Sequence, residues 1–156
     1  MKKILIALTL FTTIGFTSCF TANTPNDPIP AHTTFTISSN ILKEDRVINI
    51  WTPNGYDSMN DALPVIYMAD GGVKEDFPHV AKTLKKLIEE KKIPAAILVG
   101  IENTERRRDL TGPSEVEKDK AVAPVIGGSA NFRTFIKEEL FPKIEEKEQP
   151  LTAVLQ

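Results

Sequence analysis

The sequence has 156 residues, of which 41% are hydrophobic and 26% are charged, and its net charge is −2. These proportions are ordinary for one soluble domain and show no sign of disorder. The near balance of positive and negative charge gives no basis for binding nucleic acid.

Residues 1–18 have the layout of a bacterial export signal. Two lysines precede an apolar run over residues 4–16, and two hydroxylic residues then lead to Cys19, which is the order of a secretory signal peptide. The run is too short to span a bilayer, which needs about 20 apolar residues. A peptidase that requires a small residue three positions before its cut would meet Phe16 or Phe20 there.

Cys19 fits a lipoprotein signal better. The string Phe16-Thr17-Ser18-Cys19 resembles a loose lipoprotein box, in which the cysteine becomes the first mature residue and carries the lipid. Cys19 is also the only cysteine of the chain, so no intramolecular disulfide can use it. We therefore expect an exported protein that is anchored to a membrane through a lipid on Cys19. If the cysteine is incidental, the protein is periplasmic without an anchor.

Residues 19–31 contain three prolines and small polar residues, which predicts a proline-rich tether without a core of its own. The folded domain is then expected over residues 32–156. Its first two apolar segments, residues 33–38 and 46–51, alternate and are rich in β-branched and aromatic side chains. That pattern predicts an antiparallel hairpin.

The next two apolar segments, residues 63–68 and 95–101, are continuous rather than alternating. Such runs are typical of parallel strands that are covered on both faces. Between them, apolar residues from Phe77 to Ile88 recur at helical spacing, while lysines and glutamates occupy most of the remaining arc,. The pattern predicts a right-handed βαβ unit. Together with the hairpin, it indicates an α/β fold.

A long polar segment over residues 102–128 follows, and such a length is unusual for a compact domain unless the segment has a function. A second helix is predicted over residues 129–147, and Pro142 should kink or break it. The apolar stripe of this helix comprises Phe132, Phe135, Ile136, Leu140 and Ile144.

The loop after the first parallel strand is the candidate site, because ligands of open α/β sheets bind beyond the carboxyl ends of the strands. This loop contains Gly71 and Gly72 directly before a helix. Two glycines allow a tight turn that presents backbone amides, and such amides can stabilise an oxyanion. A plain strand-to-helix turn is the alternative interpretation.

Three segments of the chain, LPVIYMADGG, FPHVAKTLKKLIEEKKIPAAILVGIENTERRRDLTGP and GGSANFRTFIKEELFPKIEEK, resemble the esterase family of α/β-hydrolases. That family includes esterase D and the siderophore (enterochelin-type) esterases. The resemblance extends from about Thr33 to Lys147. It implies the truncated N-terminal part of an α/β-hydrolase sheet, and serine-dependent hydrolysis of a small-molecule carboxylic ester without a cofactor.

The resemblance also implies roles for individual residues. Gly71 and Gly72 would help to form the oxyanion hole, and Arg108, Asp109 and Thr111 would order the loop beside the active site. The residues themselves suggest that one arginine of the run Arg106–Arg108 could bind an acidic group of the substrate. Alternatively, these arginines pair with neighbouring carboxylates and order a surface loop.

The catalytic residues of such an esterase are not found in the sequence. The fold requires a G-x-S-x-G string, followed by an acid and then a histidine. No such string occurs, and both histidines, His32 and His79, precede the nearest candidate, Ser129. We interpret Ser129 as a helix N-cap and His79 as a packing or hydrogen-bonding residue. The expectation is an inactive, truncated or frame-shifted fragment with no catalytic residue of its own.

An incomplete sheet would expose an unpaired strand edge, which favours self-association. The alternative function is therefore a non-catalytic surface lipoprotein that uses the half-sheet as a binding or interaction module. The sequence contains no His/Cys cluster, no G-x-G-x-x-G string after a strand and no Walker loop. We accordingly expect neither a metal ion nor a cofactor.

Overall fold

The computed structural model describes residues 28–59 and 62–147. The predicted signal peptide, Cys19, most of the predicted tether and the segment 148–156 lie outside these residues. Within the described part of the chain, no helix is both long enough and apolar enough to cross a membrane.

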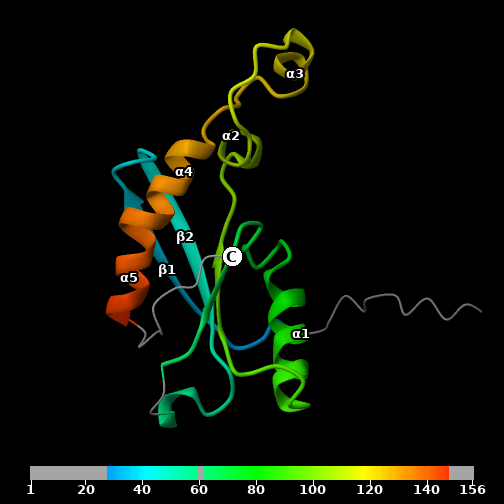
Figure 1. Ribbon diagram of the computed structural model, residues 1–156, viewed down its shortest axis with the longest axis vertical. Helices are drawn as coiled ribbons and strands as arrows, with labels where there is room; N and C mark the ends of the chain where they lie inside the picture. Colours follow the sequence, from blue (N-terminus) through cyan, green and yellow to red (C-terminus); the bar gives the residue numbers. More distant parts are fainter. Residues whose placement is uncertain (1–27, 60–61, 148–156) are drawn as a thin grey trace, which may run out of the picture.

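The described strands form one mixed sheet in the order β1-β2-β4-β3 (Figure 1). Strands β1 (Thr33–Ser39) and β2 (Glu44–Trp51) form the predicted antiparallel hairpin. Strands β3 (Val65–Met68) and β4 (Ile97–Ile101) form the predicted parallel pair. The two units join because β2 also pairs antiparallel with β4. The predicted α/β class of the fold is therefore confirmed.

The two parallel strands differ in burial. All five residues of β4 are buried, as expected for a central strand that is covered on both faces,. In β3 only Val65 is buried, and Ile66 is 40% exposed. The difference arises because β4 is the one hydrogen-bonded neighbour of β3 among the described residues.

Helices cover the two faces of the sheet (Figure 1). Helix α1 (Phe77–Glu89) lies on one face, where its buried residues Phe77, Ala81 and Leu84 pack with Trp51 and Leu98. The second helical segment lies on the other face, over a larger core. The buried residues of that core are Ile48, Ile50, Leu63, Val65, Ile97, Val99, Ile101, Phe132, Phe135, Leu140 and Ile144. The predicted apolar stripe of the second helix is thus confirmed.

The second helical segment is divided where Pro142 predicts a break. Helix α4 (Ser129–Phe135) continues into a π-helical turn, η2 (Ile136–Leu140), and then into α5 (Phe141–Lys147). A proline ring in a helix removes an N–H and crowds the preceding turn, and the wider π-helical turn lies directly before it. The N-cap of α4 is Gly128 and no side chain caps the helix, so the interpretation of Ser129 as N-cap is wrong.

The long connection after β4 contains two short helices, α2 (Arg106–Leu110) and α3 (Glu117–Val122). A short 3-10 helix, η1 (Tyr56–Ser58), follows β2. Figure 1 shows α2 above the end of β4, while α3 projects away from the sheet. This projecting segment exposes three valines, Val116, Val122 and Val125.

Candidate functional site

The carboxyl ends of β3 and β4 lie side by side, because Met68 is the parallel neighbour of Gly100. The loops that follow these strands therefore meet at one edge of the sheet, which we call the catalytic edge. It is formed by residues 69–76 after β3 and by residues 102–111 after β4. In an open α/β sheet this is the edge where ligands bind.

Gly71 fixes the first loop to the sheet. Its N–H donates to the carbonyl of Ile101 at 2.9 Å, and its carbonyl accepts from Nδ2 of the buried Asn49 at 2.9 Å. A Cβ atom on Gly71 would lie 2.2 Å from the backbone nitrogen of Ile101. Glycine is therefore required here for close packing. The left-handed backbone of the turn belongs instead to Asp70, with a φ of 54°.

Gly72 presents its N–H to a carboxylate. The amide donates to Oε2 of Glu75 at 2.7 Å, and Nδ2 of Asn103 donates to Oε1 of Glu75 at 2.7 Å. The two candidate amides of the oxyanion hole therefore differ. The N–H of Gly71 is bound to the main chain of β4, whereas the N–H of Gly72 is bound to a side chain that a ligand could displace. Sequence reasoning missed Glu75 and Asn103, although the position of Glu75, three residues after Gly72, suits such a contact.

Asp70 and Arg106 join the two loops on the outside. Nε and Nη2 of Arg106 donate to the two carboxylate oxygens of Asp70 at 2.6 and 3.0 Å, and Asn103 donates to Asp70 at 2.6 Å. The hydrogen bond from Arg106, supported by that from Asn103, holds the pKa of Asp70 below its ordinary value. The pair is open to solvent, because the side chain of Arg106 is 59% exposed.

Arg108 and Asp109 belong to a second, buried cluster. Arg108 donates to both oxygens of Glu44 at 3.0 and 2.6 Å and to Asp109 at 2.7 Å. Asp109 also pairs with Arg46 of β2, and both side chains are 1% exposed. Arg46 lies over the ring of Phe132, 5.4 Å from its centre. The cluster therefore joins β2, α2 and α4 with two positive and two negative charges.

The charges of this buried cluster control the titration of Glu44. Hydrogen bonds from Arg108, and more weakly from Thr104, lower the pKa of Glu44 to about 2, with a further contribution from the charge of Arg46. The same carboxylates raise the pKa of Arg108. Glu44 is consequently ionised at neutral pH.

Thr111 closes the base of the projecting segment. Its hydroxyl donates to the carbonyl of Arg107 at 2.6 Å and accepts from the N–H of Gly127 at 3.3 Å. Its carbonyl accepts from the N–H of Ser129 at 3.2 Å, while Gly128 donates to the carbonyl of Arg108 at 2.8 Å. The start of α4 is thereby held against α2.

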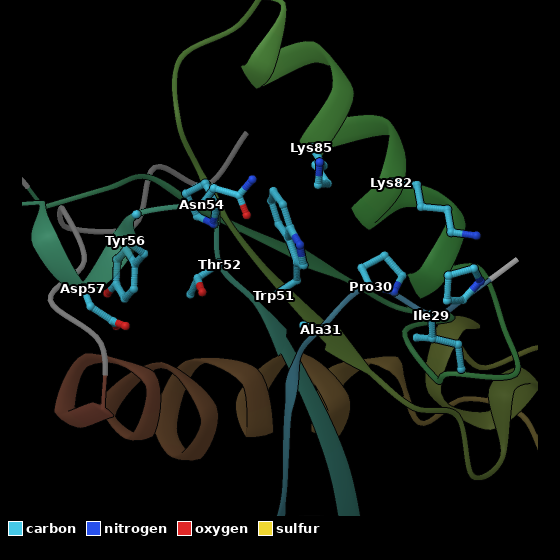
Figure 2. Close-up of a pocket in the computed structure, with 13 residues that line it drawn as sticks. Ile29, Pro30, Ala31, Trp51, Thr52, Asn54, Tyr56, Asp57, Lys82 and Lys85 are labelled. Atoms are coloured by element: carbon cyan, nitrogen blue, oxygen red, sulfur yellow. The ribbon is translucent and has the colours of Figure 1, made fainter.

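A groove of about 550 Å³ lies at the edge of the sheet opposite the catalytic edge. Trp51 at the end of β2 pairs with Leu98 near the start of β4, which places it away from the catalytic edge. Figure 2 shows its indole between Asn54 and Pro30, with Lys82 and Lys85 reaching over from α1. Lys85 is paired with Glu89. The last residues of the predicted tether, Pro28 to Ala31, line this groove.

The other polar candidates do not assemble a triad in the described residues. The sequence suggests a packing or hydrogen-bonding role for His79, and its exposed position on α1 contradicts only the packing alternative. His32 contacts the carbonyl of Pro30 and the ring of Phe77. Residues 28–59 and 62–147 contain no group of three or more His, Cys, Asp or Glu side chains that could hold a metal ion.

The chain matches the Esterase family, described as "Putative esterase", over residues 39–153. An IroE-like serine hydrolase from Shewanella oneidensis is 32% identical with a TM-score of 0.66, and the match covers 77% of this chain and 40% of that one. The BES protein from Bacillus cereus is 27% identical with a TM-score of 0.62, over 76% and 49% of the two chains.

The siderophore hydrolase EstA from Aspergillus nidulans is 23% identical with a TM-score of 0.63, over 81% of this chain and 47% of that one, and this likeness shows the fold alone. No curated protein matches the sequence. The chain thus spans less than half the length of these three solved structures. The family match covers most of the sequence, and the chain belongs to the esterase family of α/β-hydrolases.

Proposed function

We propose that residues 28–147 form the oxyanion-loop part of a serine ester hydrolase that acts on a small-molecule carboxylic ester. Relatives by fold include a siderophore hydrolase and an enterobactin esterase from Shigella flexneri solved with enterobactin, and an ester of that class is the substrate we propose. The observation that carries the proposal is the N–H of Gly72, which binds a carboxylate oxygen at the catalytic edge.

The chemistry of acyl transfer explains why this amide matters. Attack on an ester carbonyl places negative charge on its oxygen, and a preorganised N–H at that position lowers the barrier, with one such donor contributing about 10²- to 10³-fold in rate. In the structure, the carboxylate of Glu75 accepts the hydrogen bond from the N–H of Gly72. A substrate oxyanion would therefore replace Oε2 of Glu75, while Asn103 retains its bond to Oε1.

We further propose that these residues do not hydrolyse the ester by themselves. The 156-residue sequence has no G-x-S-x-G string. Ser129 begins α4, where its N–H binds the carbonyl of Thr111, and no strand leads directly into it as a nucleophile turn requires. The groups that would activate and orient a nucleophile are absent around the described Gly72 loop, whose charged partners are Asp70, Glu75 and Arg106.

A chimera tests the proposal directly. Residues 28–147 would replace the corresponding part of the IroE-like hydrolase from Shewanella oneidensis, which then supplies the remainder of its own domain. The chimera should hydrolyse 4-nitrophenyl acetate, whereas the 156-residue chain alone should hydrolyse it no faster than its Ser129→Ala variant. A folded but inactive chimera would contradict the proposed esterase role. Turnover by the chain alone that disappears in Ser129→Ala would contradict the proposed absence of a nucleophile.

Export and lipid anchoring through Cys19 are part of the same proposal. They are supported by the order of charged, apolar and small residues before Cys19,. The first described residues, Pro28 to Ala31, lie at the edge opposite the catalytic edge. Labelled palmitate should enter the full-length protein in a bacterial host and should not enter Cys19→Ala.

Within the part of the chain that the structure describes, β3 pairs with β4 alone, and this favours a second candidate function, an interaction module. Ile66 is 40% exposed on this strand, and a strand edge with free N–H and C=O groups is a template for pairing with another chain,. Cooperative unfolding together with strand-mediated self-association of the purified chain would support this function. A chimera that is active and monomeric would favour the esterase role instead.

A further inference from the structure

The three consecutive arginines of α2 differ in their partners. Arg106 is engaged by Asp70, and Arg108 is engaged by Glu44 and Asp109. Arg107 is exposed, and its Nη1 donates to the carbonyl of Val122 at 2.6 Å. Within residues 28–59 and 62–147, Arg107 has no ion pair with a carboxylate. Its charge is therefore available to a ligand.

Arg107 lines a pocket of about 310 Å³ between α2 and the end of α3. The other lining residues are Glu105, Val122, Ala123, Pro124 and Val125. Val122 is 62% exposed and Val125 is 48% exposed. Two exposed valines and a proline beside a guanidinium form a surface that suits a small apolar body bearing an anionic group.

The pocket belongs to the catalytic edge. Helix α2 follows β4 after a short loop, and Figure 1 shows it above the end of that strand. Arg106, next to Arg107, reaches Asp70 beside Gly72. The hydroxyl of Thr111 holds the carbonyl of Arg107 at 2.6 Å, so the backbone that carries this side chain is fixed.

We propose that Arg107 is a specificity residue that binds a carboxylate of the ligand, with the valines of the pocket contacting its apolar or aryl part. This inference rests on the proposed esterase function, because the ligand would be an ester substrate or product acid that bears a free carboxylate. The bond from Nη1 to Val122 leaves Nε and Nη2 as an edge that fits a carboxylate in bidentate geometry. Glu105 also lines the pocket, and its negative charge disfavours binding of the ligand carboxylate.

The test measures binding without turnover. Fluorine NMR would follow 4-fluorobenzoate and its neutral analogue 4-fluorobenzamide in the presence of the full 156-residue chain. The benzoate should bind about tenfold more tightly than the benzamide, which is the size expected for a hydrogen-bonded charge pair. Equal affinity of the two probes, or no binding of the benzoate at millimolar concentration, would overturn the proposal.

Three variants locate the effect. Arg107→Gln should weaken benzoate binding about tenfold, because its amide can still donate to the carbonyl of Val122 but carries no charge. Lys118→Gln removes one positive charge from exposed α3 without altering the pocket lining, and it should bind as the wild type does. Glu105→Gln should bind benzoate about two- to threefold more tightly, because a like charge is removed.

The outcomes separate this proposal from the esterase proposal. Wild-type affinity in Arg107→Gln, or an equal loss in Lys118→Gln, would show that no specific site exists at Arg107. Neither result would bear on the esterase role, which the activity of the chimera tests separately. Conversely, the chimera could be inactive while benzoate binding still depends on Arg107. That outcome would support the carboxylate site and contradict the ester substrate. Equal thermal melts of the variants would confirm that each has folded.

Discussion

Two clusters of ion pairs hold α2 to the rest of the molecule, and they differ in exposure. Arg46 and Asp109 in one cluster are each 1% exposed, whereas Arg106 in the other is 59% exposed and pairs with Asp70. Buried charges require partners because their desolvation is costly, while exposed pairs contribute about 0–1 kcal/mol. The buried cluster therefore determines where α2 lies, and the exposed pair can yield to a ligand at little cost in stability.

This division suits a site whose scaffold is rigid and whose loop adjusts. The buried cluster ends at Phe132 and Gly128, on the start of α4, so α2 and α4 are fixed together. The exposed cluster ends at Asp70, two residues before Gly72, and at Glu75, which accepts the N–H of Gly72, and Asn103 donates to both carboxylates. Substitutions in the two clusters should accordingly differ in size and in their dependence on pH and salt.

The largest effect is expected for Asp109→Ala. Removing this carboxylate leaves Arg46 buried with Glu44 as its remaining partner, and breaking a buried pair in this way costs about 3–5 kcal/mol. Urea unfolding followed by circular dichroism should show a loss near the lower end of that range. A loss below about 1 kcal/mol would mean that the buried cluster is no more important than the exposed one.

A double variant sharpens this prediction. Arg46→Met with Asp109→Leu removes one charge of each sign and fills the space with apolar side chains. Such replacements of buried ion pairs are often neutral, so the double variant should recover most of the stability that Asp109→Ala loses. If it is less stable than Asp109→Ala, specific hydrogen bonds of the cluster, rather than an uncompensated charge, hold α2 in place.

The second prediction concerns pH. The pKa of Glu44 is about 2 in the folded protein, mainly because of Arg108, against an ordinary value of 4.5. A lowered folded pKa stabilises the protein above the unfolded pKa, and this contribution disappears as the pH falls from about 4.5 to about 2. The free energy of unfolding should lose on the order of 2–3 kcal/mol in this window.

Glu44→Gln provides the matched control for the pH effect. It removes the titrating group but keeps an acceptor for Arg108, so its stability should vary less between pH 5 and pH 2 than that of the wild type. The remaining acid sensitivity would then come from other carboxylates, such as Asp70. Identical pH profiles for the wild type and Glu44→Gln would assign the buried cluster no role in acid stability.

The fold could be predicted from the sequence where the periodicity of apolar residues is strong. Alternation over residues 33–38 and 46–51 identified the hairpin, and the continuous run at residues 95–101 identified the central strand β4. The pairing of β2 with β4 could not be predicted, because alternation determines which face of a strand is buried and not which strand lies beside it.

The site was predictable only in outline. The Gly71-Gly72 loop could be located from its place after a strand, and Glu75 lies only three residues after Gly72. The other interactions could not be predicted, because Asn103 and Arg46 act through contacts between elements that are distant in the sequence. Arginine in an alternating strand gives no sign that it is buried. Glu44 and Arg46 become partners of α2 only when β2 and β4 are adjacent, a pairing that no local pattern encodes.

The third prediction compares the two glycines of the loop. Gly71→Ala should destabilise the protein by about 1–3 kcal/mol, because the new methyl group would meet backbone atoms of β4, including the Ile101 nitrogen at 2.2 Å,. At Gly72 the nearest atoms are at 2.9 Å and belong to the side chains of Glu102 and Glu75, which can move. Gly72→Ala should therefore cost less than about 1 kcal/mol. Equal losses in urea unfolding would show that the loop is not anchored at Gly71 alone.

The smallest effect is expected for the exposed cluster itself. Asp70→Asn removes the charge that pairs with Arg106, yet asparagine tolerates the left-handed backbone of this position, where φ is 54°,. The loss of stability should be below about 1 kcal/mol and should shrink further at high salt, which screens exposed pairs. Urea unfolding at low and high ionic strength measures both quantities. A larger loss that persists in salt would mean that Asp70 holds the Gly72 loop as rigidly as Asp109 holds α2, and the contrast between the two clusters would no longer stand.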